Sequence, residues 1–144
     1  MVIAMEGFYL TQILCSFFMC GLIWVIQLVH YPTFNFVDEP KFSAFESFHT
    51  SRITLIVVPI MIIELLSAVV LVMYSQNLIF ITNLIFVLVI WLVTFTFSVP
   101  FHTALCKAKN DQLIQKLILT NWLRTILWTI KSILLIFWFK NILP

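Results

Sequence analysis

Charged residues are scarce in this sequence. Only 10% of its 144 residues are charged, whereas 62% are hydrophobic. A soluble domain has about 25% charged and about 45–50% apolar residues. A water-facing surface cannot be built from this composition, and no dense basic face exists for binding nucleic acid. The sequence therefore predicts an integral membrane protein without a soluble domain, with the lipid bilayer as its first partner.

Cysteine is scarce as well. Cys15, Cys20 and Cys106 are an odd number and form no C-x-x-C motif, which argues against a disulfide framework and against a thiol oxidoreductase. A cleavable signal peptide is not expected either. Glu6 makes the leading segment acidic, and residues 27–30 contain no small-residue cleavage pattern. We therefore expect the first hydrophobic run to be retained as a helix.

Four apolar runs are present, at about residues 8–29, 53–74, 78–99 and 117–139. A transmembrane helix needs about 20 predominantly apolar residues. The fold class predicted is all-α, a polytopic bundle of four transmembrane helices in a single membrane domain covering residues 1–144. Because proline disfavours helical geometry in the residue before it, Pro32 and Pro100 are expected to end the first and third helices.

A short amphipathic helix is predicted between the first two runs. Phe42, Phe45, Phe48 and His49 recur there at helical spacing, with polar residues between them. Such a pattern is typical of a helix that lies in the membrane interface.

Basic residues predict the orientation. The segments after the first and third runs contain Lys41, Arg52, Lys107, Lys109 and Lys116. An excess of lysine and arginine marks the cytoplasmic side. Both termini are therefore expected on the non-cytoplasmic side of an inner or plasma membrane.

Polar residues gather at the predicted cytoplasmic face. His30, His49 and His102 all lie near helix boundaries that meet there. Three imidazoles can bind a first-row transition metal such as Fe, Cu or Zn, or they can exchange protons. Arg52 and Arg124 are expected to hold an anionic group of the substrate. These five residues are the predicted catalytic set, and the histidines are the predicted metal ligands.

Aromatic and amide side chains predict a ligand pocket beside this set. Asn121, Arg124 and Trp128 follow three- and four-residue steps along one stripe of the fourth run, which would face the bundle interior. Tyr31, Phe101, Trp122 and Trp128 are expected to wall a pocket for a flat, lipophilic small molecule, and Asn121 is predicted to bind the same ligand. An interfacial aromatic belt explains Tyr31 and Trp122 equally well.

One pair of charges lies deeper. Glu64 is eleven positions past Ile53, and Lys131 is nine positions past Trp122. At about 1.5 Å per residue, both side chains reach a similar depth near the bilayer centre. A lone charge there costs about 2.5–3.5 kcal/mol on insertion scales. We predict an intramembrane ion pair, which either fixes helix packing or takes part in a proton relay.

A family resemblance covers nearly the whole chain. The motifs that carry it are His30-Tyr31-Pro32, Phe48-His49-x-x-Arg52, Pro59 with Glu64, and Asn121-Trp122-x-Arg124-x-x-x-Trp128. They resemble the four-helix membrane family, of mostly unknown function, that includes the fungal anthrone oxygenases. The resemblance implies a four-helix bundle with an oxygenase-like site for a lipophilic aromatic substrate.

Three functions follow from these observations. The first is a membrane oxidoreductase or oxygenase acting on a lipophilic molecule at the cytoplasmic interface. The second is a non-catalytic integral subunit of a larger membrane complex. The third is a small proton-coupled transporter that uses Glu64 and Lys131, for which four helices are few unless the protein forms a homo-oligomer.

Overall fold

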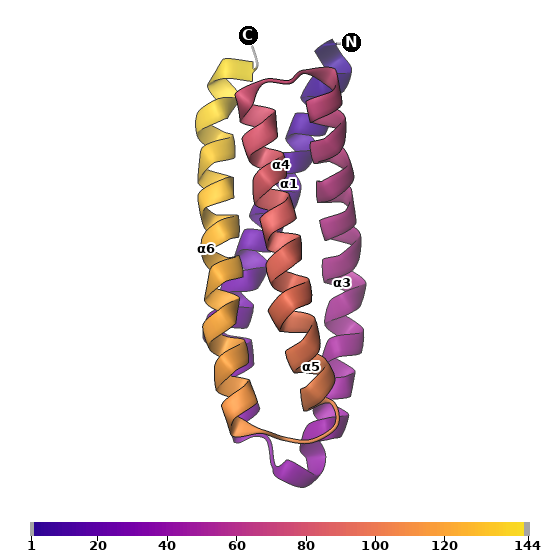
Figure 1. Cartoon of the computed structure of the whole chain (residues 1–144), viewed down its shortest axis with the longest axis vertical. Helices are drawn as coiled ribbons and strands as arrows, with labels where there is room; N and C mark the ends of the chain where they lie inside the picture. The colour runs from indigo at the N-terminus through magenta and orange to yellow at the C-terminus, as the bar shows by residue number, and fades with distance from the viewer. Residues whose placement is uncertain (1, 143–144) are drawn as a thin grey trace.

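Four long helical spans make up the protein (Figure 1). The computed structural model describes residues 2–142, and it describes the side chains of residues 5–139. The first span consists of α1 (Val2–Val25), η1 (Ile26–His30), α2 (Tyr31–Thr33) and η2 (Phe34–Phe36). The others are α3 (Glu39–Tyr74), then α4 (Leu78–Val93) with η3 (Thr94–Ser98) and α5 (Val99–Leu105), and α6 (Asp111–Ile142). The predicted all-α four-helix bundle is confirmed.

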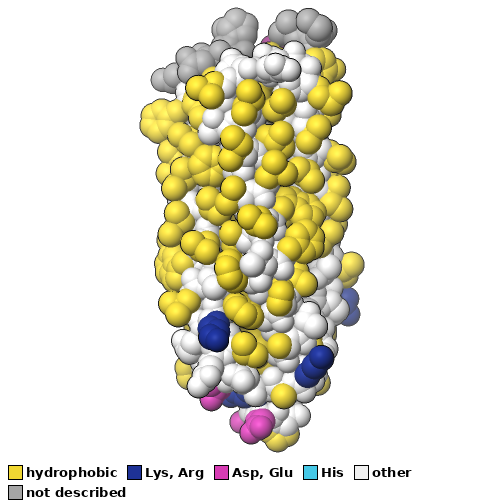
Figure 2. Space-filling model, in the orientation of Figure 1, with side chains coloured by type: hydrophobic (Ala, Val, Ile, Leu, Met, Phe, Trp, Pro, Cys, Tyr) yellow, Lys and Arg dark blue, Asp and Glu magenta, His cyan; other side chains and the backbone are white. Residues whose placement is uncertain are grey.

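All four spans are long and apolar enough to cross a membrane. The beginning of α1 and the end of α6 lie at one end of the bundle, and the connections at residues 37–38 and 106–110 lie at the other (Figure 1). We call the latter the lower end. Hydrophobic side chains cover the face seen in Figure 2, and the charged side chains visible there gather near the lower end. This distribution is that of an integral membrane protein.

The first and third spans continue past the prolines that were predicted to end them. A π-helical segment precedes each proline: η1 precedes Pro32, and η3 precedes Pro100. A proline ring clashes with the carbonyl four residues earlier and supplies no N–H. Those carbonyls belong to Leu28 and Thr96, which lie inside the two π segments. The widened turn absorbs the proline, so the helical path goes on to Phe36 and Leu105.

The predicted interfacial helix is wrong as a separate element. Residues 42–49 belong to α3, which runs without a break from Glu39 to Tyr74. Its lower part buries Phe42, Glu46 and His49 inside the bundle. The amphipathic pattern is real, but its inward stripe packs against other helices instead of facing lipid headgroups. The second span therefore starts at Glu39, not near residue 53.

Side-chain amides cap two of the helices at their first turns. Asn77 Oδ1 accepts from the backbone N–H of Ile79 at 3.0 Å, at the start of α4. Asn110 Oδ1 accepts from the N–H of Leu113 at 3.0 Å, so α6 begins at Asp111, before the predicted start of its apolar run. Such caps satisfy N–H groups that have no partner within the helix.

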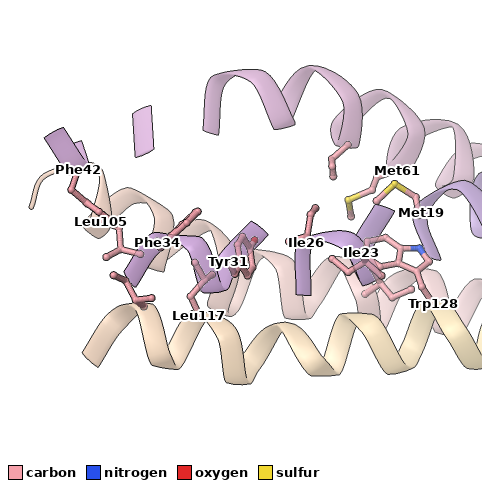
Figure 3. Packing of buried hydrophobic residues seen from close by; sticks show 13 residues of the cluster. Met19, Ile23, Ile26, Tyr31, Phe34, Phe42, Met61, Leu105, Leu117 and Trp128 are labelled. Carbon is pink, nitrogen blue, oxygen red and sulfur yellow. The ribbon is translucent and has the colours of Figure 1, made fainter. Parts of the chain in front are cut away.

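Buried side chains form a continuous column through the bundle (Figure 3). Trp128 and Met61 lie at one end of the view, Tyr31 and Phe34 in the middle, and Phe42 near the lower end. A second cluster around Tyr9 and Leu135 fills the upper part. Helices in lipid associate through close packing and polar contacts rather than through the hydrophobic effect. The polar contacts inside this column form the sites described next.

Candidate functional site

The histidine pair at the lower end is formed by His30 and His49. His30 ends η1, and His49 projects from α3. His30 Nε2 lies 2.7 Å from His49 Nδ1, and the ring centroids are 4.3 Å apart. The ring of Phe34 packs edge-on against both imidazoles, with centroids 5.4 Å and 5.5 Å away. The pair is therefore held in an aromatic environment in which each imidazole is the other's polar partner.

The third histidine belongs to a relay of three residues. Tyr31 Oη lies 2.9 Å from His102 Nε2, and His102 Nδ1 is hydrogen-bonded to Glu46 Oε1. When Glu46 is a carboxylate, which only accepts, Nδ1 carries the proton, and in the neutral imidazole Nε2 accepts from the Tyr31 hydroxyl. Glu46 and Tyr31 are buried. This carboxylate–imidazole–hydroxyl order orients a base and lets it take a proton through its neighbour.

The relay ends at the wall of a cavity of about 480 Å³. The cavity lies between α3 and the third span, and Tyr31 and His102 both line it. Its apolar wall includes Val57, Met61 and Trp91. Ligand pockets are typically about 300–1,000 Å³ and mostly apolar, with few polar groups. The space therefore suits one lipophilic small molecule.

The cavity opens sideways, toward the surface that faces lipid. Among its lining residues, Thr54 and Val58 of α3 and Phe95 and Val99 of the third span are exposed on the outside of the bundle. Entry between these helices needs no passage through water.

Arg124 lines the same cavity from α6. It is 5% exposed, and its guanidinium donates to Ser98 Oγ at 3.1 Å and to Asn121 Oδ1 at 3.3 Å. Its Cζ lies 5.3 Å from the ring centroid of Trp128. Its Nε has no partner within the described part of the chain. The Tyr31 hydroxyl also neighbours the guanidinium, and none of these partners is a carboxylate.

Two predicted site residues lie elsewhere. Arg52 is exposed on α3, and its Cζ lies 5.4 Å from the ring centroid of Phe48. Trp122 packs edge-on against Trp24 with centroids 5.6 Å apart, and it does not line the cavity. Both residues lie at the predicted level along the bundle axis, but on a side of their helices that does not face the cavity. They do not belong to the site.

Asn121 and Trp128 were predicted as ligand contacts, and the structure gives both other partners. Asn121 Nδ2 donates to Gln27 Oε1 at 2.8 Å, and its Oδ1 accepts from Arg124. Trp128 Nε1 donates to Glu64 Oε2 at 3.3 Å. Neither residue lines the cavity. Asn121 instead holds Arg124, which lines the cavity, and Trp128 joins the deeper polar network through Glu64.

The three histidines come together, but their nitrogens do not converge on one point. His30 Nε2 and His49 Nδ1 face each other, and the two nitrogens of His102 face Tyr31 and Glu46. Among the described residues, no group of three His, Cys, Asp or Glu is arranged to hold a metal ion. The donor set thus does not fit the predicted Fe, Cu or Zn site, and it fits proton transfer.

The deeper network brings Glu64 and Lys131 together. Lys131 Nζ lies 2.7 Å from Glu64 Oε1, and both side chains are 1% exposed. Lys131 also donates to Ser16 Oγ at 2.6 Å and to Gln12 Oε1 at 3.1 Å, so all three of its protons have acceptors. Complete pairing of this kind favours the packing role over the transport role.

Several partners in these networks were missing from the predicted site, among them Glu46 and Asn83. Glu46, which carries the carboxylate of the relay, was not among the predicted site residues. Asn83, which donates to Gln12 Oε1 at 3.1 Å, was missed entirely. Its signal was available, because it is an amide in the middle of an apolar run, and polar residues within a membrane face the bundle interior.

Comparisons of the chain with protein-family models, with curated proteins and with solved structures found no match. The functional assignment therefore rests on the geometry of the site. Its central feature is the relay of Tyr31, His102 and Glu46, which ends at the wall of a cavity that opens to lipid.

Proposed function

We propose that this chain is a membrane-embedded enzyme that binds a lipophilic small molecule from the bilayer and transfers a proton to or from it. The observation that carries the proposal is that Tyr31 and His102, hydrogen-bonded to each other, both line the lipid-opening cavity. A tyrosine at the end of a carboxylate–histidine pair can pass a substrate proton to the imidazole. Glu46 then stabilises the imidazolium that forms.

The oxidoreductase form of this proposal uses molecular oxygen as co-reactant, and the resemblance to the anthrone oxygenase family supports it. The relay removes a proton from an activated methylene, and the resulting carbanion gives electrons to O₂. The overall change is R₂CH₂ + O₂ → R₂C=O + H₂O, in which the methylene is oxidised and oxygen is reduced. No step is assigned to a metal ion, because four of the six histidine ring nitrogens are taken up by the His30–His49 contact, Tyr31 and Glu46, and no group of three ligands is arranged around a metal among the described residues.

Deuterium exchange tests the proton transfer directly. The purified protein in nanodiscs is incubated in D₂O under argon with lipophilic carbon acids such as anthrone, 2-tetralone and 1-indanone. We expect exchange of the acidic C–H of at least one of them to be faster than in empty nanodiscs. Admission of air then tests oxygenation, through O₂ uptake and ketone formation. Exchange equal to that of empty nanodiscs for every probe would contradict the proposal and favour a non-catalytic subunit.

We further propose that the lower end, with the site, faces the cytoplasm. The basic residues Lys107, Lys109 and Lys116 all belong to that end, as the positive-inside rule requires. In a background without the native cysteines, a cysteine at Gln76 should react with an impermeant maleimide added to intact cells. A cysteine at Lys109 should react only after the cells are opened. The reverse pattern would overturn the orientation.

A further inference from the structure

We infer that the ligand of this cavity is a lipophilic organic acid, bound as its anion with the anionic oxygen against Arg124. The inference rests on the proposed function only for the cavity, and it does not depend on the proton relay. It names the chemical class of the molecule that the cavity takes.

The first support is the charge balance around Arg124. The chain has six Asp and Glu residues, and the side chains of all six lie in the described part of the chain. None of them has an oxygen within 4.0 Å of the Arg124 guanidinium. None of its described partners is a carboxylate: they are Ser98, Asn121, the ring of Trp128 and the neighbouring hydroxyl of Tyr31. A buried cation without an anion is costly in a membrane, and a ligand anion removes that cost.

The second support is a pair of buried donors without partners, on two residues that line the cavity. Arg124 Nε and Trp91 Nε1 are buried and have no partner among the described residues, and both residues line the cavity. Buried donors are nearly always paired. Two such donors, on residues of α4 and α6 that line the cavity, match a ligand with acceptor oxygens.

The third support is the contrast between this cation and Lys131. Lys131 is equally buried, but it contacts a carboxylate, a hydroxyl and an amide oxygen. The protein thus provides a full set of acceptors for one buried cation and not for the other. The remaining wall of the cavity is apolar, which matches a ligand with a single anionic group on a hydrocarbon body.

A matched pair of fluorescent probes tests the inference by equilibrium binding. 2-Naphthoate carries the anion, and its methyl ester has nearly the same shape without the charge. Both are titrated into wild-type protein in phosphatidylcholine nanodiscs, with empty nanodiscs subtracted. For each probe, the Kd of Arg124→Gln is divided by that of the wild type, which cancels partitioning into lipid.

We expect Arg124→Gln to weaken naphthoate binding by about tenfold or more, because a charge-assisted hydrogen bond is lost. The Kd of the ester should change by less than about twofold, as for a site that is not involved. Arg124→Lys should keep the preference for the acid, and Arg52→Gln, which removes an exposed arginine of α3, should change neither Kd. If Arg124→Gln does not fold, the test uses the wild type and Arg124→Lys. For each protein, the Kd of 2-naphthoate is then compared with the Kd of its methyl ester.

Equal affinities of the wild type for acid and ester would overturn the inference. So would an acid preference that survives in a folded Arg124→Gln protein. Native mass spectrometry adds a further outcome: phosphatidylglycerol bound to wild type and released by Arg124→Gln would assign the cation to a lipid headgroup, which also overturns it. A wild-type protein that prefers the acid but does not accelerate deuterium exchange would refute the proposed enzyme and leave the inferred ligand class standing.

Discussion

His102→Gln is expected to lower the rate of deuterium exchange into the substrate by about 10²–10⁴-fold, the usual contribution of a general acid–base group. Glutamine still donates to Glu46 through its amide, so the buried carboxylate keeps a partner. It cannot accept and hold a proton as imidazole does. Tyr31→Phe should cause a loss of similar size, because it removes the hydroxyl that connects His102 to the cavity.

The double variant distinguishes a relay from two independent contributions. Residues that act as one unit are strongly non-additive, so Tyr31→Phe with His102→Gln should be no slower than the slower single variant. His30→Gln is the matched control, since His30 lies nearby but bonds to His49 and not to the relay. It should retain exchange within about tenfold of wild type. A loss as large as that of His102→Gln would contradict the assigned relay.

The second large effect concerns folding. Glu64→Gln and Lys131→Met should each destabilise the bundle by about 3–5 kcal/mol, because each leaves a buried charge without its partner. The double variant should recover part of that loss, since no unpaired charge remains. The measurement is the monodisperse fraction in detergent and the midpoint of unfolding in a denaturing detergent titration.

Lys116→Met is the control for this series, because Lys116 lies in the same helix and is exposed. It should behave as the wild type. Losses that add up in the double variant would show that Glu64 and Lys131 act separately, in spite of the 2.7 Å between Nζ and Oε1.

The number of helices could be predicted from the sequence, but their ends could not. Runs of apolar residues report the hydrocarbon thickness, and the helices extend beyond it into polar sequence at Glu39 and Asp111. Pro32 and Pro100 were read as terminators because proline removes a hydrogen bond. Whether a π turn absorbs that loss depends on packing against neighbouring helices, which a local sequence rule does not contain.

The Glu64–Lys131 pair was predictable for a related reason. It was located by counting residues from the lower end, and α3 and α6 contain no π segment between that end and the pair. The same counting placed Arg52 at the height of the histidines. The inward stripe of α3, however, passes from the buried His49 past the partly buried Ile53 to the buried Val57, and it leaves Arg52 outside. The level of a residue along the bundle axis follows from the sequence, whereas the side of the helix on which it lies follows from contacts with neighbouring helices.

The two π segments keep the first and third spans in step with each other. Gln12 bonds to Asn83 in the upper network, and Tyr31 bonds to His102 in the lower one; both pairs are 71 residues apart. Along each span, nineteen residues separate the two partners. At 3.6 residues per turn, nineteen residues overshoot five turns by about 100°, so an uninterrupted α-helix would turn its second partner away.

One extra residue in a wide turn removes this overshoot, and each span has one such turn between its two partners. The upper and lower polar networks are therefore separated by the same rotation and the same distance along both spans. Deletion of one residue from η1 or η3 alone would rotate either Tyr31 or His102 by about a quarter turn. The contact between Gln12 and Asn83 would stay intact. The hydrogen bond between Tyr31 and His102 at the lower end thus depends on two local irregularities that match each other.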